Sequence, residues 1–498
     1  MHIRMKKQLQ NILNTLQNIH SKLQALTIDE RMVLLENCQK AAIVVGENIE
    51  KGVIEDPKII PLLEEYCEKI YMLSQVDEIT SVHMNDINSF LGVIREHIDN
   101  LSEKYRVVFL PYKDDMWDSL ESIWRAFSKD ARCECDVVPI PYFEANSEEK
   151  KWEPRYDGAR FPKDVPVTSF EYYRLEEMQP DIAFIHNPYD NCNYITSVHP
   201  AFYSDELKKN VKKLVYVPYY ANTGFIAEDF QQLPVCAHMD YMIVQSELAK
   251  ESCKGKNFYD KILPLGSPKF DNIMYKTRNG VQVPDEWEKV IEGKKTLMLN
   301  TTINDILNNE QKLLDKLKHF FEMVKSKNDV AIIWRPHPLL SATVKAMRPQ
   351  LYEGYEKLVQ YFVENKVGIL DTTGDVSNTV VIAGGYIGSS YSSVVNLFTV
   401  SGKPVFLFDS QVIYEKSLRG DENPEEFFDK KSLYDYFACR ETKQYTVDDF
   451  IEDFANDALA QVRKRQLEAV SDIAANLDGT CGEKVYEYMM NVLLNEEK

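Results

Sequence analysis

The chain has 498 residues, too many for one hydrophobic core, which predicts two large domains with extensions. Its formal net charge of −20, from 78 acidic against 58 basic residues, argues against nucleic acid and against broad electrostatic adhesion to anionic lipid. Nine scattered cysteines fit a reducing compartment better than a disulfide framework, and the pair Cys133 and Cys135 lacks the further ligands of a metal site.

The N-terminal part, residues 1–102, predicts a helical extension. Apolar residues recur at spacings of four and three, at Met5, Leu9, Ile12, Leu16, Ile19, Leu23 and Leu26. A capping box at Thr27–Glu30 predicts a second helix to about Gly52, and two more helices follow near 61–73 and 85–101. The stripe either packs on the chain's own helices or pairs between copies to form a homodimer. Fewer than four heptads is short for the second interpretation.

The start of the chain is basic but lacks the apolar core of a signal peptide, and no apolar run reaches the roughly 20 residues that span a bilayer. We therefore expect a cytoplasmic protein without a transmembrane segment. Peripheral contact with the inner face of the membrane is left open.

From Tyr105 onward, strands alternate with helices, which is typical of parallel α/β sheets. The first series of strands is expected at 106–110, 136–140, 182–186, 214–218, 241–245 and 262–265, with a helix at 116–127. A charged interval with Arg278, Gly280 and Pro284 predicts a linker. The second series is expected at 296–300, 330–334, 368–370, 386–388 and 404–408, with helices at 309–325 and 351–364 and a helical tail.

Two such series predict an α/β protein of GT-B type, in which two Rossmann-like domains face a cleft. We expect a helical extension at 1–102, an acceptor domain at 103–278, a donor nucleotide-binding domain at 279–440 and C-terminal helices at 441–498. Ligands of such sheets bind beyond the carboxyl ends of the strands. The polar clusters below all follow predicted strands.

Arg335 and His337 follow a buried strand and are flanked by Pro336 and Pro338. A guanidinium can hold phosphate through two parallel hydrogen bonds. His337 could bind phosphate as an imidazolium or protonate a leaving phosphate. Both are catalytic candidates.

Hydroxyl groups follow a neighbouring strand, at the start of a predicted helix. The stretch contains Ser390, Ser392 and Ser393, and a helix start offers backbone N–H groups to phosphate. Thr301 and Thr302 end another strand and could contact phosphate or ribose. These hydroxyls are substrate-binding candidates.

Further substrate-binding candidates stand beside these. Gly266, Ser267 and Lys269 precede the linker, where Lys269 could face a phosphate, although Gly-Ser-Pro is also common turn chemistry. Asp371 and Asp375 could meet a hydroxyl of the donor, or could only cap a helix.

The order of these motifs resembles that of the CDP-glycerol glycerophosphotransferases of teichoic acid synthesis. The resemblance covers about Leu263 to Asp409 and includes Lys403-Pro404-Val405-Phe406. It implies a GT-B fold, CDP-glycerol as the donor, and donor contacts by Arg335, His337, Ser392 and Ser393. It implies no cofactor, and the sequence shows no cluster of metal ligands.

The first half departs from that family's pattern. Teichoic acid polymerases carry a His-Gly motif after an acceptor-domain strand, whereas this chain has Val217-Pro218-Tyr219-Tyr220-Ala221-Asn222-Thr223-Gly224. The stretches around Trp117 and Asp190 resemble a less characterised branch. His186, Asp190 and Asp114 are candidates for the missing base, and Asp114 and Trp117 also count as substrate-binding candidates.

The sequence favours a transferase that moves glycerol phosphate, or a similar polyol phosphate, from a CDP-activated donor to a hydroxyl of a glycan, glycolipid or teichoic-type acceptor. Two alternatives remain. One is a GT-B glycosyltransferase that uses a nucleotide sugar, and the other is a non-catalytic nucleotide-binding scaffold. Neither a P-loop nor a nucleophile elbow occurs in the sequence.

Overall fold

The computed structural model describes residues 1–50, 55–146, 151–221, 225–389, 392–408, 438–440 and 445–496. The chain forms two compact units, one of Met1–Val107 with Ser128–Cys135 and one of Val108–Phe127 with Asp136–Lys498. Within the described ranges, no helix has the length and apolar character required to cross a membrane.

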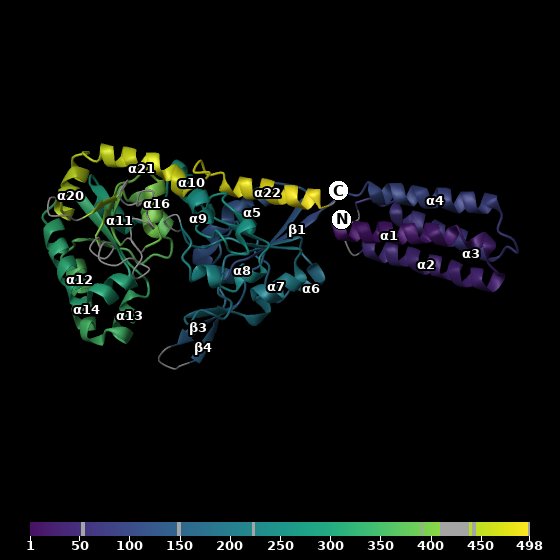
Figure 1. The fold of residues 1–498 in the computed structure, drawn as a ribbon, viewed down its shortest axis with the longest axis horizontal. Coiled ribbons are helices and arrows are strands. Elements are labelled where there is room, and N and C mark those ends of the chain that lie inside the picture. The colour runs from purple at the N-terminus through teal and green to yellow at the C-terminus, as the bar shows by residue number, and fades with distance from the viewer. Residues whose placement is uncertain are drawn as a thin grey trace. The chain divides into compact units, whose positions relative to one another are not determined.

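The first unit is built on four helices (Figure 1), α1 (Ile3–His20), α2 (Ile28–Glu50), α3 (Ile59–Ser74) and α4 (Ser81–Asp99). Helices α1 and α3 each pack against α2 and α4. Leu9, Leu16 and Leu23 of the heptad stripe are at most 1% exposed and belong to the core of this bundle. The stripe therefore packs on the chain's own helices, while a homodimer stays a prediction. The predicted end of the second helix, at Gly52, lies outside the described residues.

The first α/β half contains a sheet of six strands in the order β2-β1-β5-β7-β8-β9. Strands β5, β7, β8 and β9 pair in parallel. Its strands are β1 (Tyr105–Leu110), β2 (Cys133–Val137), β5 (Ile182–Ile185), β7 (Lys213–Tyr216), β8 (Tyr241–Ile243) and β9 (Ile262–Leu263). Its helices are α5 (Glu121–Ser128), α6 (Leu175–Met178), α7 (Ser204–Asn210), α8 (Val235–His238) and α9 (Glu247–Glu251). The predicted helix at 116–127 begins instead as the 3₁₀ helix η2 (Asp114–Ser119).

A second, antiparallel sheet of three strands was not predicted. It consists of β3 (Tyr142–Asn146), β4 (Lys151–Arg155) and β6 (Thr196–Val198), in the order β4-β3-β6. Most of its side chains are exposed or half-buried. Hydrophobic periodicity could not reveal it, because one face of β4 carries only charged residues and the other only Trp152 and Pro154.

The second half contains a parallel sheet in the order β12-β11-β10-β13-β14-β15. Along β10, Leu297 and Leu299 pack against helices on one face of the sheet, whereas Met298 packs against helices on the other. Strands buried on both faces read as continuous apolar runs, which is why they were predictable. The strands are β10 (Lys295–Thr301), β11 (Val330–Pro336), β12 (Gly368–Leu370), β13 (Gly385–Gly388), β14 (Val405–Leu407) and β15 (Ala438–Arg440).

The helices of this half are α10 (Pro268–Asn279), α11 (Asp285–Ile291), α12 (Ile303–Val324), α13 (Leu340–Met347), α14 (Pro349–Glu364), α15 (Val376–Ile382), α16 (Val394–Val400), α20 (Val447–Ala455) and α21 (Ala460–Ile473). Helix α12 starts earlier than predicted, and Glu310 is non-helical inside it. The last helix, α22 (Cys481–Asn495), returns to the first half, where Gly482 lies against the Ser122 carbonyl. The two sheets confirm the predicted α/β fold of GT-B type.

Candidate functional site

Four neighbouring strands of the second sheet bring the predicted donor residues to one edge. The register places Asn300 of β10 beside Arg335 of β11 and Gly388 of β13. Asn300 donates from Nδ2 to the Arg335 carbonyl at 3.0 Å and accepts from the Tyr386 hydroxyl at 3.2 Å. This side chain therefore ties the three strands together where they end.

Arg335 is 7% exposed, and its guanidinium faces other protein groups. Nη1 donates to Asp371 Oδ2 at 2.6 Å and to Thr373 Oγ1 at 3.1 Å. Nη2 donates to the Thr373 carbonyl at 2.7 Å and the Gly374 carbonyl at 3.4 Å. In this conformation Arg335 holds the loop after β12, and its phosphate-binding role stays a prediction.

Asp371 and Asp375 have local partners as well. Asp371 is 1% exposed and also accepts from the Thr379 hydroxyl at 2.6 Å and from Thr373. Asp375 accepts from Ser377 N–H at the start of α15 and pairs with Lys276. Despite the opposing effect of burial, hydrogen bonding and the Lys276 charge lower the pKa of Asp375. Both carboxylates organise the loop in the described structure.

His337 lies where β11 ends, and its backbone N–H donates to the Thr301 carbonyl at 2.9 Å. Its Nδ1 accepts from Leu339 N–H at 3.2 Å. Although the residue is solvent-accessible, loss of water around the ring lowers the pKa of His337. The matching neutral tautomer carries its proton on Nε2, so the ring can donate a hydrogen bond from that atom.

The predicted hydroxyl groups lie at the same edge. Thr301 accepts from the Trp334 indole at 3.2 Å, and Thr302 caps α12 through Asp305. Ser392 Oγ accepts from Val394 N–H at 3.3 Å, so it is used locally. Ser393 precedes α16 and is exposed. Ser390 lies outside the described residues.

The segment with Gly266, Ser267 and Lys269 connects the two halves. Gly266 has φ +101°, and a Cβ atom there would lie 2.6 Å from the Ala475 carbonyl oxygen. Lys269 is 9% exposed and donates to both oxygens of Asp118, at 2.6 and 2.7 Å. Asp271 accepts from Cys481 N–H and Gly482 N–H at the start of α22. This segment anchors α22, which sequence reasoning missed because the partners are about 210 residues away.

His186 is fully buried at the end of β5. Its Nε2 accepts from Tyr112 N–H at 3.0 Å, and its Nδ1 lies 3.0 Å from Ser119 Oγ. Burial lowers the pKa of His186 to about 3. With both nitrogens engaged, this histidine is poorly placed to act as the predicted base.

The other candidates for the base differ in their surroundings. Asp190 is 6% exposed and accepts twice from Ser204, at 3.0 and 2.7 Å. Asp114 is half-buried, and its contact with Arg160, at 3.4 Å, is longer. Burial raises the pKa of both carboxyls. Trp117, 3% exposed, packs on Trp124 rather than presenting its ring to solvent.

Four aromatic side chains that were not among the sequence-based candidates lie at the carboxyl edge of the first sheet. Tyr189, Tyr219, Tyr220 and Phe230 are half-buried neighbours. The Tyr189 and Tyr219 hydroxyls are 3.1 Å apart. The sequence did contain a signal for this cluster, because Tyr219 and Tyr220 directly follow the strand predicted at 214–218. A small cavity lies beside Tyr220, lined also by Pro218, Gln245, Gly266 and Ser267.

No group of three or more His, Cys, Asp or Glu side chains in the described part of the chain is arranged to hold a metal ion.

The model of the family described as CDP-Glycerol:Poly(glycerophosphate) glycerophosphotransferase matches residues 208–487, more than half of the chain. No curated protein matches the chain.

Similar solved structures include the wall teichoic acid polymerase TagF, at 15% identity and a TM-score of 0.45, covering 89% of this chain and 100% of that one. The UDP-GlcNAc 2-epimerase from Neisseria meningitidis bound to UDP-GlcNAc is 10% identical with a TM-score of 0.47, covering 78% of this chain and 100% of that one. The UDP-GlcNAc 2-epimerase from Methanocaldococcus jannaschii is 13% identical with a TM-score of 0.46, and the match covers 78% of this chain and 99% of that one.

Proposed function

The chain belongs to the CDP-glycerol:poly(glycerophosphate) glycerophosphotransferase family, and on that premise we propose that it transfers glycerol phosphate, or a similar polyol phosphate, from a CDP-activated donor to an acceptor hydroxyl. The acceptor is a cell-surface glycan, glycolipid or teichoic-type chain. The reaction takes place in the cytoplasm, where the membrane's inner face can present a lipid-linked acceptor.

The observation that carries this proposal is the extent of the family match, which includes the entire carboxyl edge of the second sheet. We assign the donor to this edge. His337 and the loop held by Arg335 and Asp371 contribute to its binding, together with the hydroxyls of Thr302 and Ser393.

In the proposed reaction the acceptor oxygen attacks the β-phosphorus of the donor. A new oxygen–phosphorus bond forms as the bond from that phosphorus to the bridging oxygen breaks, and CMP leaves with the bonding electron pair. His337 donates a hydrogen bond from Nε2 to the phosphate of the departing CMP. Such a donor is most effective where charge develops in the transition state.

The acceptor hydroxyl must also lose its proton. Asp114 is our candidate for the base, because its carboxylate is half-buried and has one long ionic contact, whereas the ring of His186 and the carboxylate of Asp190 are held by hydrogen bonds to protein groups. A carboxylate with a raised pKa is a better base than one in water.

A donor-binding panel tests this proposal. Calorimetry with CDP-glycerol, CDP-ribitol, CMP and a UDP-sugar should show tight binding of the cytidine compounds only. Tighter binding of the UDP-sugar would contradict the donor assignment and leave the fold unaffected.

A further inference from the structure

Four aromatic rings form a continuous surface at the carboxyl edge of the first sheet. The Tyr219 and Tyr220 ring centres are 5.5 Å apart, those of Tyr220 and Phe230 are 4.9 Å apart, and those of Tyr189 and Phe230 are 6.1 Å apart. All four side chains are half-buried, so part of each remains accessible to solvent. We call these four residues the aromatic surface.

The buried ring of His186 packs against the aromatic surface and fixes its position. The ring of His186 packs edge-on against Tyr219 at 6.4 Å and against Tyr112 at 5.3 Å. His186 is itself fixed by hydrogen bonds to Tyr112 and Ser119. The aromatic surface is therefore held in place before any ligand arrives, which reduces the entropy lost on binding.

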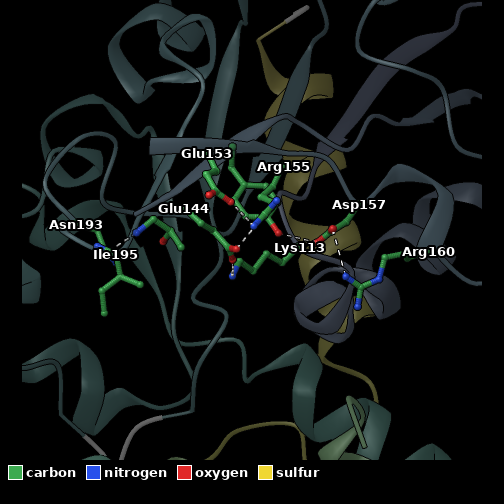
Figure 2. Close-up of polar contacts among 10 residues, drawn as sticks. Lys113, Glu144, Glu153, Arg155, Asp157, Arg160, Asn193 and Ile195 are labelled. Carbon is green, nitrogen blue, oxygen red and sulfur yellow. Dashed lines mark hydrogen bonds and ion pairs between the residues drawn. The ribbon is translucent and has the colours of Figure 1, made fainter. Parts of the chain in front are cut away.

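The charges that border this edge are unsuited to a polyanion. Figure 2 shows Lys113 and Arg155 both paired with Glu144, at 3.0 and 3.1 Å. Arg160 pairs with Asp157 at 3.4 Å. Each of these cations already has a carboxylate partner.

The same holds for Lys269, which pairs with Asp118 of the 3₁₀ helix η2. The same helix carries Asp114, which pairs with Arg160, and the exposed Asp115. A chain of glycerol phosphates carries one negative charge per unit, which the carboxylates at this edge repel. A neutral ligand avoids that repulsion.

We propose that the aromatic surface is the acceptor subsite and that it binds the ring of a neutral pyranose sugar, rather than a poly(glycerol phosphate) chain. The C–H face of a pyranose lies flat against aromatic rings, while its hydroxyls hydrogen-bond with groups such as the Tyr189–Tyr219 hydroxyl pair. This inference rests on the proposed transferase function and specifies its acceptor.

The cavity beside Tyr220 supplies a place for one substituent of the sugar. It has room for about one water molecule, and its lining includes Gln245 and Ser267. A single hydroxyl group of the acceptor fits there, which orients the ring on the aromatic surface.

The first test compares acceptors with the wild-type protein. With CDP-glycerol as donor, CMP release and product mass are followed for p-nitrophenyl hexopyranosides and for a synthetic glycerol phosphate oligomer. We expect transfer to the hexopyranosides, with an acceptor KM that is nearly independent of salt. Preferential transfer to the oligomer, with a KM that rises with salt, would overturn the inference while leaving the transferase intact.

The second test removes one ring. Tyr220→Ala should raise the acceptor KM about tenfold, as expected for one lost ring contact, whereas Tyr220→Phe should keep most of the affinity. Tyr194, which is 92% exposed and outside the aromatic surface, provides the matched control Tyr194→Ala, with an unchanged KM. If Tyr220→Ala leaves the KM unchanged, the aromatic surface is not the subsite. If that variant does not fold, the wild-type comparison still decides.

Measurements of donor binding distinguish a failure of the proposed transferase function from a failure of the acceptor inference alone. Calorimetry with CDP-glycerol should give the same affinity for wild type, Tyr220→Ala and Tyr194→Ala. If wild type does not bind CDP-glycerol, the proposed function fails and the inference falls with it. If wild type binds CDP-glycerol and transfers only to the oligomer, the inference alone is overturned.

Discussion

At the scale of single residues, hydrogen-bond partners decide which candidate side chains remain available to a substrate. His337 uses Nδ1 to accept from Leu339 N–H, which leaves Nε2–H as its donor. Arg335 and His186, by contrast, direct their nitrogens at protein groups. The same residue type can therefore serve binding at one strand end and structure at another.

His337 should act as a hydrogen-bond donor rather than as a general acid. His337→Ala should lower kcat about 10²–10³-fold, as expected for loss of one transition-state donor. His337→Gln should recover to within about tenfold of wild type, because the glutamine amide can donate from a similar position. Equal loss in both variants would show that the proton itself is transferred.

The pH profile tests the same point. Because the pKa of His337 is lowered, its ring is neutral at about pH 7 and above. We expect kcat to stay level as the pH rises above about 7. A general acid would instead lose roughly tenfold in rate per pH unit above its pKa.

The main contribution of Arg335 should be to the free energy of unfolding rather than to donor binding. Arg335→Ala leaves the buried Asp371 carboxylate without its charged partner, at a cost of about 3–5 kcal/mol in the free energy of unfolding. Lys276→Ala removes a cation from a more exposed pair and should cost at most about 1 kcal/mol. Loss of donor affinity without loss of stability would instead show a direct phosphate contact.

The buried His186 should make folding sensitive to acid. Its pKa of about 3 lies below the value of about 6.5 in the unfolded chain. Between these values the unfolded state binds more protons, so stability falls as the pH drops, by up to about 1.4 kcal/mol per unit. His186→Asn removes the titrating ring and can still donate to Ser119 from the position of Nδ1, so urea unfolding should show a shallower pH dependence. An unchanged slope would contradict this account.

At the scale of elements, the segment from Gly266 to Asp271 connects the end of β9 to α22. Gly266 lies against Ala475, Lys269 pairs with Asp118, and Asp271 caps α22. The motif that looked like a phosphate-binding turn therefore also fastens the C-terminal helix.

Gly266→Ala should be more destabilising than an ordinary glycine replacement. Its positive φ and the Ala475 carbonyl together predict a loss of about 2–5 kcal/mol in the free energy of unfolding. Gly255 also has a positive φ, but a Cβ atom there meets nothing within 4 Å, so Gly255→Ala should cost about 1–2 kcal/mol. Equal costs in urea unfolding would show that the contact with Ala475 is unimportant.

Elements with strong local signals were predictable, and those defined by distant partners were not. The buried strands β10 and β11 are continuous apolar runs, and α14 shows helical periodicity, so their places were correct to within two residues. The hairpin β3–β4 carries charged residues that pair across its two strands, as Glu144 does with Arg155, and with Lys113 outside the hairpin. No local pattern encodes such pairing.

At the scale of the whole molecule, the two parallel sheets and the family match agree on a glycerophosphotransferase of GT-B type. The sheet edges occupied by candidates such as Arg335, His337 and His186 could be predicted, because these residues follow predicted strands. The engagement of Arg335 by Asp371, and of His186 by Tyr112, could not, because both depend on tertiary contacts between separate strands.

The most direct test of the central claim is product analysis with CDP-glycerol as the only donor. We predict that CMP is released in equal amount to an acceptor product that has gained one glycerol phosphate, and that His337→Ala greatly slows both. Absence of CMP release in the presence of acceptor, or an acceptor product without the added glycerol phosphate, would contradict the account.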